Sequence, residues 1–135
     1  MEDNKRQQKL VLIVEDEAAL RMAVGDILQA EGFAVLQATN GLEGLNTALK
    51  EHPDLILLDL MMPVMDGLTM LEKLRADEWG KNVPVFPLTN NNSPEAIAQA
   101  TKFGPAKYGP VDFHMKSDWN LGDIVQKIKK VLEVA

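Results

Sequence analysis

Acidic side chains stand at the ends of two apolar runs, where a chain that folds into a parallel sheet can do chemistry. Asp59 ends the apolar run of residues 55–58, and Glu15 and Asp16 follow the run Leu10–Val14. Ligands of open α/β sheets bind at the carboxyl ends of the strands. A charge at the edge of a core is costly unless it is paired or binds a cation. The pattern therefore favours a cation site built from carboxylates.

Two further residues extend this pattern. Thr89 follows the run of residues 83–88, and Lys116 follows the run of residues 111–115. Taken alone, each residue has an ordinary explanation, because threonine commonly ends strands and a lysine at a strand end is usually solvated. The first acidic pair could likewise cap a helix. These separate explanations give no reason why all the groups share one end of the sheet.

The elements that must position these residues alternate between short apolar runs and amphipathic stretches, in five βα units. This alternation is typical of a parallel sheet covered on both faces. We expect a polar loop over residues 76–82 and a fourth helix that begins at Ser93 and Pro94. The apolar positions expected to face the sheet are Leu20, Ala23, Val24, Ile27 and Leu28, then Leu42, Leu45, Ala48 and Leu49, then Leu68, Leu71 and Leu74, then Ile97, Ala100 and Phe103, and finally Leu121, Ile124, Val125, Ile128, Val131 and Leu132.

Residues with special backbone preferences mark the helix ends. Gly32 can take the left-handed conformation that closes the first helix, and Asn40 can cap the second. Pro53 disfavours the helical region for His52, so the second helix ends there. Gly67 opens the third helix.

Composition limits the class of protein. The chain has 135 residues, of which 46% are hydrophobic and 25% are charged, and this suits one globular domain. We expect a polar tail over residues 1–8 and a single domain over residues 9–135. The net charge of -6 argues against direct binding to nucleic acid or an anionic membrane. With no cysteine, thiol catalysis and zinc-thiolate sites are excluded. No apolar run approaches a membrane span, and we expect a cytoplasmic protein.

Over roughly residues 9–134 the chain resembles the receiver domain of two-component response regulators, like the single-domain chemotaxis regulator. The residues that carry the resemblance are Glu15, Asp16, Asp59, the tail Met61, Met62, Pro63, Val64, Met65, Asp66 and Gly67, then Thr89 and Lys116. The resemblance implies a doubly wound, five-stranded parallel sheet in the order 2-1-3-4-5, in a flavodoxin-like three-layer sandwich.

The resemblance also implies a magnesium site. Strands 1 and 3 are neighbours in that order, so Glu15, Asp16 and Asp59 converge and would repel one another without a cation. Mg²⁺ prefers one or two carboxylates together with waters and phosphate oxygens. The implied ligands are Asp16, Asp59 and the carbonyl of Met61, with Glu15 acting through a water.

The implied function is a regulatory switch and not an enzyme. Asp59 would accept a phosphoryl group from a histidine kinase or phosphotransfer protein, with Lys116 and Thr89 binding the phosphoryl oxygens. Phe113 matches the family's switch aromatic, although an aromatic in a strand usually serves packing alone. A monomer or a weak, phosphorylation-dependent homodimer would then present the phosphorylated state to a downstream protein.

Several residues depart from the family pattern on its signalling face. Ser117 stands where a proline is usual, so we expect a trans peptide bond there. Asn90 replaces a small residue, and Pro87 removes a ladder donor inside the fourth strand. Residues 104–108 are five more than the family spacing requires. The departures permit a second interpretation, a receiver-like binding module that works without phosphate.

A flavin carrier of the same doubly wound type is a weaker third interpretation. Such a protein would need a hydroxyl- and glycine-rich phosphate loop after the first strand. This chain instead has Glu15, Asp16 and Glu17 there, which are electrostatically opposite.

Deleting residues 104–108 should leave phosphorylation of Asp59 by acetyl phosphate nearly unchanged and should alter partner binding or self-association. An insertion in a surface loop costs little folding free energy, since each doubling of loop length adds only ~0.6 kcal/mol. Mass spectrometry and analytical ultracentrifugation can measure the two effects. Loss of phosphorylation or of folding would mean that the segment belongs to the core.

Overall fold

Five parallel strands form a single sheet in the order β2-β1-β3-β4-β5. The computed structural model describes residues 8–59, 65, 67–89, 114–115 and 121–132. The strands are β1 (Leu10–Val14), β2 (Ala34–Ala38), β3 (Leu55–Asp59), β4 (Val85–Thr89) and β5 (His114–Met115). The predicted fold class and strand order are confirmed.

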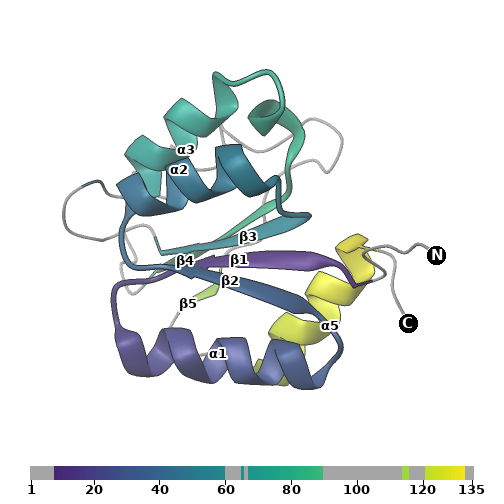
Figure 1. The fold of residues 1–135 in the computed structure, drawn as a ribbon. Coiled ribbons are helices and arrows are strands. Elements are labelled where there is room, and N and C mark those ends of the chain that lie inside the picture. The colour runs from purple at the N-terminus through teal and green to yellow at the C-terminus, as the bar shows by residue number, and fades with distance from the viewer. Residues whose placement is uncertain (1–7, 60–64, 66, 90–113, 116–120, 133–135) are drawn as a thin grey trace.

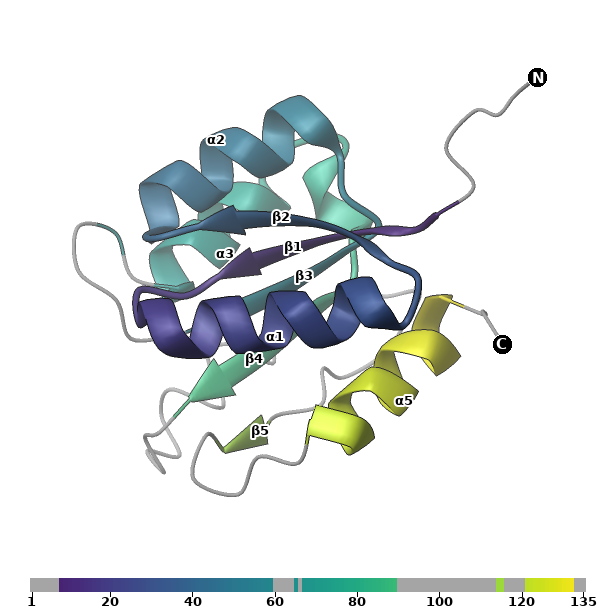
Figure 2. The same ribbon diagram turned by 60° about the horizontal axis from the view of Figure 1, so that its bottom comes forward.

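Helices cover both faces of this sheet (Figures 1 and 2). The described helices are α1 (Ala18–Ala30), α2 (Gly41–Glu51), α3 (Gly67–Arg75), the short 3-10 turn η2 (Gly80–Asn82) and α5 (Leu121–Leu132). α2 and α3 lie on one face, and α1 and α5 lie on the other (Figure 1). The expected fourth helix lies outside the described residues. No helix within the described ranges is long and apolar enough to span a membrane.

The central strands are buried on both faces, which explains why they read as unbroken apolar runs. Alternate residues of β1 and β3 enter two separate cores. Leu12 and Ile56 pack in the cluster that holds residues of α2 and α3. Val11 and Leu57 pack with residues of α1 and α5.

α1 ends at a glycine, as predicted. Gly32 has φ 99°, and its N–H donates to the Gln29 carbonyl at 3.0 Å. The Phe33 N–H donates to the Leu28 carbonyl, also at 3.0 Å, and this pair of bonds closes the last turn. The prediction that Ala23 faces the sheet is wrong, because it is exposed. The buried face of α1 instead includes Gly25, whose lack of a side chain hides it from a hydropathy pattern.

α2 begins at the predicted cap. The Asn40 side chain accepts from the Glu43 N–H at 2.8 Å, and Glu43 in turn accepts from the N–H and hydroxyl of Thr39. Those bonds from Thr39, the backbone one foremost, hold the pKa of Glu43 below its usual 4.5. The resulting stabilisation is present above pH 4.5 and is lost as the pH falls through the lowered pKa.

At its other end α2 stops at His52, which has a left-handed backbone conformation with φ 50°.

The buried face of α2 differs from the predicted one. Leu42 and Leu49 are exposed by 45% and 36%, so their assignment to the core is wrong. The buried residues of the helix are Gly41, Gly44, Leu45 and Ala48. A Cβ at Gly44 would come within 2.8 Å of the Val14 side chain, so the helix approaches β1 closely at Gly44. This close approach leaves Leu42 and Leu49 on the outer side of the helix.

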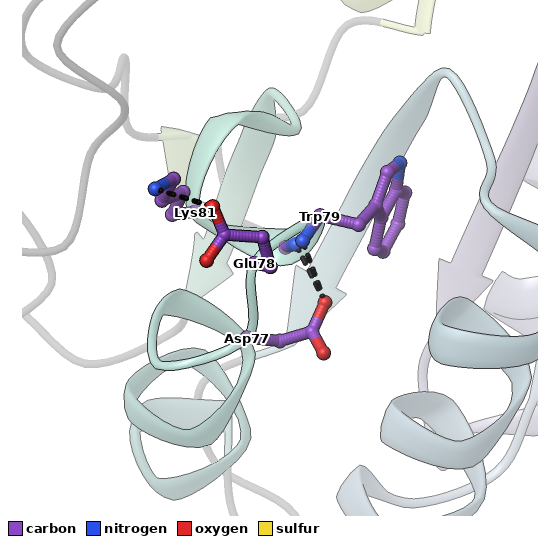
Figure 3. A network of polar contacts seen from close by, with 5 residues as sticks. Asp77, Glu78, Trp79 and Lys81 are labelled. Carbon is purple, nitrogen blue, oxygen red and sulfur yellow. Dashed lines mark hydrogen bonds and ion pairs between the residues drawn. The ribbon is translucent and has the colours of Figure 1, made fainter.

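The predicted polar loop before β4 contains η2, which an Asx turn introduces. The carboxylate of Asp77 accepts from the N–H groups of Trp79 and Gly80, each at 2.9 Å (Figure 3). Lys81 and Glu78 pair at 3.2 Å in the same turn, but both side chains are exposed and the pair adds little stability.

Arg75 and Trp79 fasten this turn to the rest of the domain. The Arg75 guanidinium donates to the carbonyls of Gly80 and Val83, both at 2.7 Å. Burial lowers the pKa of Arg75 to about 10, so the group is still charged at neutral pH. The Trp79 indole stacks on the His52 imidazole with ring centroids 4.3 Å apart, linking the turn to the end of α2. These contacts fix the start of β4.

α5 presents the predicted apolar stripe, with Ile124, Val125 and Ile128 buried. Its Lys129 pairs with Glu31 beyond α1 at 2.7 Å, joining the two helices on this face.

Leu45→Ala and Leu49→Ala test the orientation of α2 as a matched pair. Leu45→Ala should lower the free energy of unfolding by about 2–5 kcal/mol, because Leu45 is only 8% exposed. Leu49→Ala should change it by less than about 0.5 kcal/mol. Urea unfolding followed by circular dichroism gives both values, and equal losses would contradict the orientation described here.

Candidate functional site

The register of the central strands brings two acidic residues side by side. Val14 of β1 lies opposite Leu58 of β3, so the next residues on the two strands are Glu15 and Asp59. The Glu15 N–H donates to the Ala38 carbonyl at 3.0 Å and so extends the pairing with β2 by one bond. Glu15 is therefore held by the sheet and not by a loop.

Three carboxylates meet at this edge. One oxygen from each of Glu15, Asp16 and Asp59 lies within 4.8 Å of the others. Glu15 is 1% exposed and Asp59 is 2% exposed, whereas Asp16 is open to solvent. Buried carboxylates this close repel one another, and a cation among them relieves the repulsion. Oxygen donors with an open side suit a hard ion that keeps some of its waters, so this donor set fits Mg²⁺.

Neighbouring groups orient the Glu15 residue. Its carboxylate accepts from the Glu17 N–H at 3.0 Å, and its carbonyl accepts from the Arg21 guanidinium at 2.9 Å. Arg21 also donates to the Gln37 side chain at 3.1 Å. No sequence pattern pointed to Arg21 or Gln37, since their role depends on the pairing of β1 with β2. The N-cap of α1 is Glu17, so neither residue of the acidic pair occupies that position.

Thr89 closes β4 beside the acidic group. Leu88 lies opposite Asp59, so Thr89 follows immediately on the neighbouring strand. Met115 of β5 pairs with Thr89, and Lys116 is the next residue in the chain. Asp59 and Thr89 therefore stand at the carboxyl ends of neighbouring strands.

The remaining predicted site residues, Met61, Lys116 and Phe113, lie outside the described residues. Of the departures from the family pattern, Pro87 lies within β4 opposite Leu58, between β3 and β5 as expected. Asn90, Ser117 and residues 104–108 are not among the described residues.

The doubly wound sheet and the carboxylates at its carboxyl edge define an α/β protein with an acidic site suited to a divalent cation. The family model of the response regulator receiver domain matches residues 11–114. The chain belongs to this family of two-component signalling proteins. That membership rules out the flavin-carrier interpretation.

Known proteins agree with this assignment. Sporulation initiation phosphotransferase F of Bacillus subtilis is 30% identical over 90% of this chain and 92% of its own length. A CheY-like receiver domain protein from Methanospirillum hungatei superposes with a TM-score of 0.81 at 30% identity, over 94% of this chain and 95% of that one. A protein-glutamate methylesterase/protein-glutamine glutaminase of Archaeoglobus fulgidus is 38% identical over 93% of this chain, which spans only 35% of that relative's length.

Receiver domains are regulatory and generally bind Mg²⁺ at an acidic pocket. The group formed by Glu15, Asp16 and Asp59 could hold such an ion.

Asp59→Asn should abolish the stabilisation that Mg²⁺ gives the wild type, because it removes a charged oxygen donor from the three carboxylates that converge at this edge. Bound Mg²⁺ should raise the wild-type Tm by mass action, by about 2.7 kcal/mol of stability at a hundred times Kd. Differential scanning calorimetry with and without Mg²⁺ measures the effect in both proteins.

The matched control is Asp26→Asn, which removes an exposed carboxylate of α1 and should keep the Mg²⁺ response. A wild type whose Tm ignores Mg²⁺ would contradict a cation site here.

Proposed function

We propose that this chain is a stand-alone phosphoacceptor of a two-component phosphorelay, in which Asp59 receives a phosphoryl group from a histidine kinase or phosphotransfer protein. The observation that carries the proposal is the acidic group at the sheet edge, where the buried Asp59 stands within 4.8 Å of two further carboxylates. Membership of the receiver family and the likeness to a sporulation phosphotransferase support it.

In this proposal Asp59 is the nucleophile. One of its carboxylate oxygens attacks phosphorus, the phosphorus–nitrogen bond to the donor imidazole breaks, and the imidazole keeps the electron pair and takes up a proton. Mg²⁺, when bound, neutralises the carboxylates and the phosphoryl oxygens so that the two anions can approach. Asp16, Asp59 and the Met61 carbonyl would hold the ion directly, and Glu15 would do so through a water.

Two side chains from neighbouring strand ends would complete the site. The Lys116 ammonium would pair with the phosphoryl oxygens, and the Thr89 hydroxyl would donate to one of them. The movement of Thr89 towards the phosphoryl group would bias Phe113 between two positions, and this would change the surface shown to a downstream protein. The monomer or a weak homodimer would carry that signal.

Acetyl phosphate and Mg²⁺ should add one acid-stable, base-labile phosphate to the wild type and none to Asp59→Asn. EDTA should prevent the addition, because the carboxylates then repel the incoming anion. Mass spectrometry of the intact protein and of its peptides locates the group.

Asp26→Asn, in which an exposed carboxylate is neutralised, should be labelled like the wild type. Labelling that survives in Asp59→Asn or in EDTA would count against the phosphoacceptor and in favour of a binding module that works without phosphate.

A further inference from the structure

The start of α2 touches the chain segment that follows Asp59. The Gly41 N–H donates to the Met65 carbonyl at 2.9 Å. Met65 stands six residues after Asp59 and two before Gly67, the first residue of α3. An amide at the beginning of α2 thus binds the backbone between the proposed phosphoacceptor and the next helix.

Only glycine fits at this contact. A Cβ at position 41 would overlap the Met65 carbonyl oxygen and would lie 2.9 Å from the carbonyl carbon. The obstacle is backbone, which cannot rotate away as a side chain can. At Gly25 of α1, by contrast, an added Cβ would first meet the mobile end of the Gln37 side chain at 3.1 Å.

The first turn of α2, which carries the Gly41 N–H, is itself stabilised by capping hydrogen bonds. The Asn40 side chain caps the helix through the Glu43 N–H at 2.8 Å, and Glu43 reaches back to Thr39 at 2.6 and 2.8 Å. One turn later Gly44 packs directly on Val14, the residue before Glu15. α2 is therefore fixed to the same strand that ends in the acidic group.

We propose that Gly41, held by the Asn40 cap, is a positioning residue for the site. Asp59 is anchored in β3 and Met65 is anchored by Gly41, so the chain is held on both sides of Met61 in the sequence. The Met61 carbonyl is a proposed ligand of Mg²⁺. The inference rests on the proposed function for its chemical consequence, but the anchor itself is a feature of the fold.

Phosphoryl transfer is sensitive to such an anchor because the protein contributes mainly positioning and charge. A misplacement of about 1 Å can cost on the order of a hundredfold in rate. Gly41→Ala should therefore slow Mg²⁺-dependent phosphorylation by acetyl phosphate by roughly tenfold to a hundredfold. It should also weaken Mg²⁺ binding, measured by calorimetric titration of the unphosphorylated protein.

Two controls separate positioning from general instability. Leu45→Ala removes core contacts from the same helix without changing residue 41, and Leu49→Ala removes an exposed side chain from that helix. Assayed where both are folded, they should keep the wild-type phosphorylation rate and Mg²⁺ affinity.

Changing the cap gives a second and milder test. Asn40→Ala should speed hydrogen exchange at the Gly41 amide, measured by NMR, and should lower the phosphorylation rate less than Gly41→Ala does. Asn40→Asp keeps the oxygen acceptor and should restore both quantities. If Gly41→Ala fails to fold, this pair decides the question.

The proposal is overturned if folded Gly41→Ala matches the wild type in rate and Mg²⁺ affinity, or if Leu45→Ala is slowed as much as Gly41→Ala. It is also overturned if Asn40→Ala exchanges the Gly41 amide faster with no loss of rate or affinity. A wild type that takes no phosphate defeats the proposed function instead, and Mg²⁺ affinity then decides the positioning role.

Discussion

The burial of two carboxylates next to each other is the constraint that the rest of the structure must accommodate. Glu15 directly follows β1 and Asp59 ends β3, and both side chains are almost inaccessible to solvent. Burial of like charges opposes folding, and the fold tolerates it because the remainder of β1 and β3 is wholly apolar and covered on both faces. The same arrangement creates an attraction for a cation that a solvated pair of acids would lack. Stability and chemistry therefore compete at this edge.

Contacts at the opposite edge of the sheet, where the strands begin, keep the strands aligned. There the described contacts are neutral or attractive: Asp77 caps the turn of η2, Arg75 binds two carbonyls, and Trp79 stacks on His52. These contacts determine where β4 begins, and β4 in turn sets Thr89 one residue beyond the partner of Asp59. Contacts at the edge where the strands begin thus align the strand ends that carry the acidic group.

Local chemistry predicted much of this fold, and tertiary contacts decided the rest. The buried runs, the glycine that ends α1 and the Asn40 cap all follow from neighbouring residues, and the structure agrees. The inward face of α2 did not follow, because a hydropathy pattern favours Leu42 and Leu49 over glycines. Gly41 and Gly44 are buried for a reason that appears only when Met65 and Val14 are brought to them. Strand ends likewise predicted that Glu15, Asp16 and Asp59 would converge, whereas the bonds from Arg21 depend on the pairing of β1 with β2.

The strand order also has a consequence for synthesis. β1 is an interior strand of the sheet, yet it precedes both of its partners, β2 and β3, in the chain. A nascent chain that emerges from its amino end therefore exposes the run Leu10–Val14 with two open edges. The first edge closes when β2 arrives, and the second stays open until Leu55–Asp59 has been made. During that interval the apolar β1 lacks one of its two partners, and its open edge exposes the growing chain to aggregation.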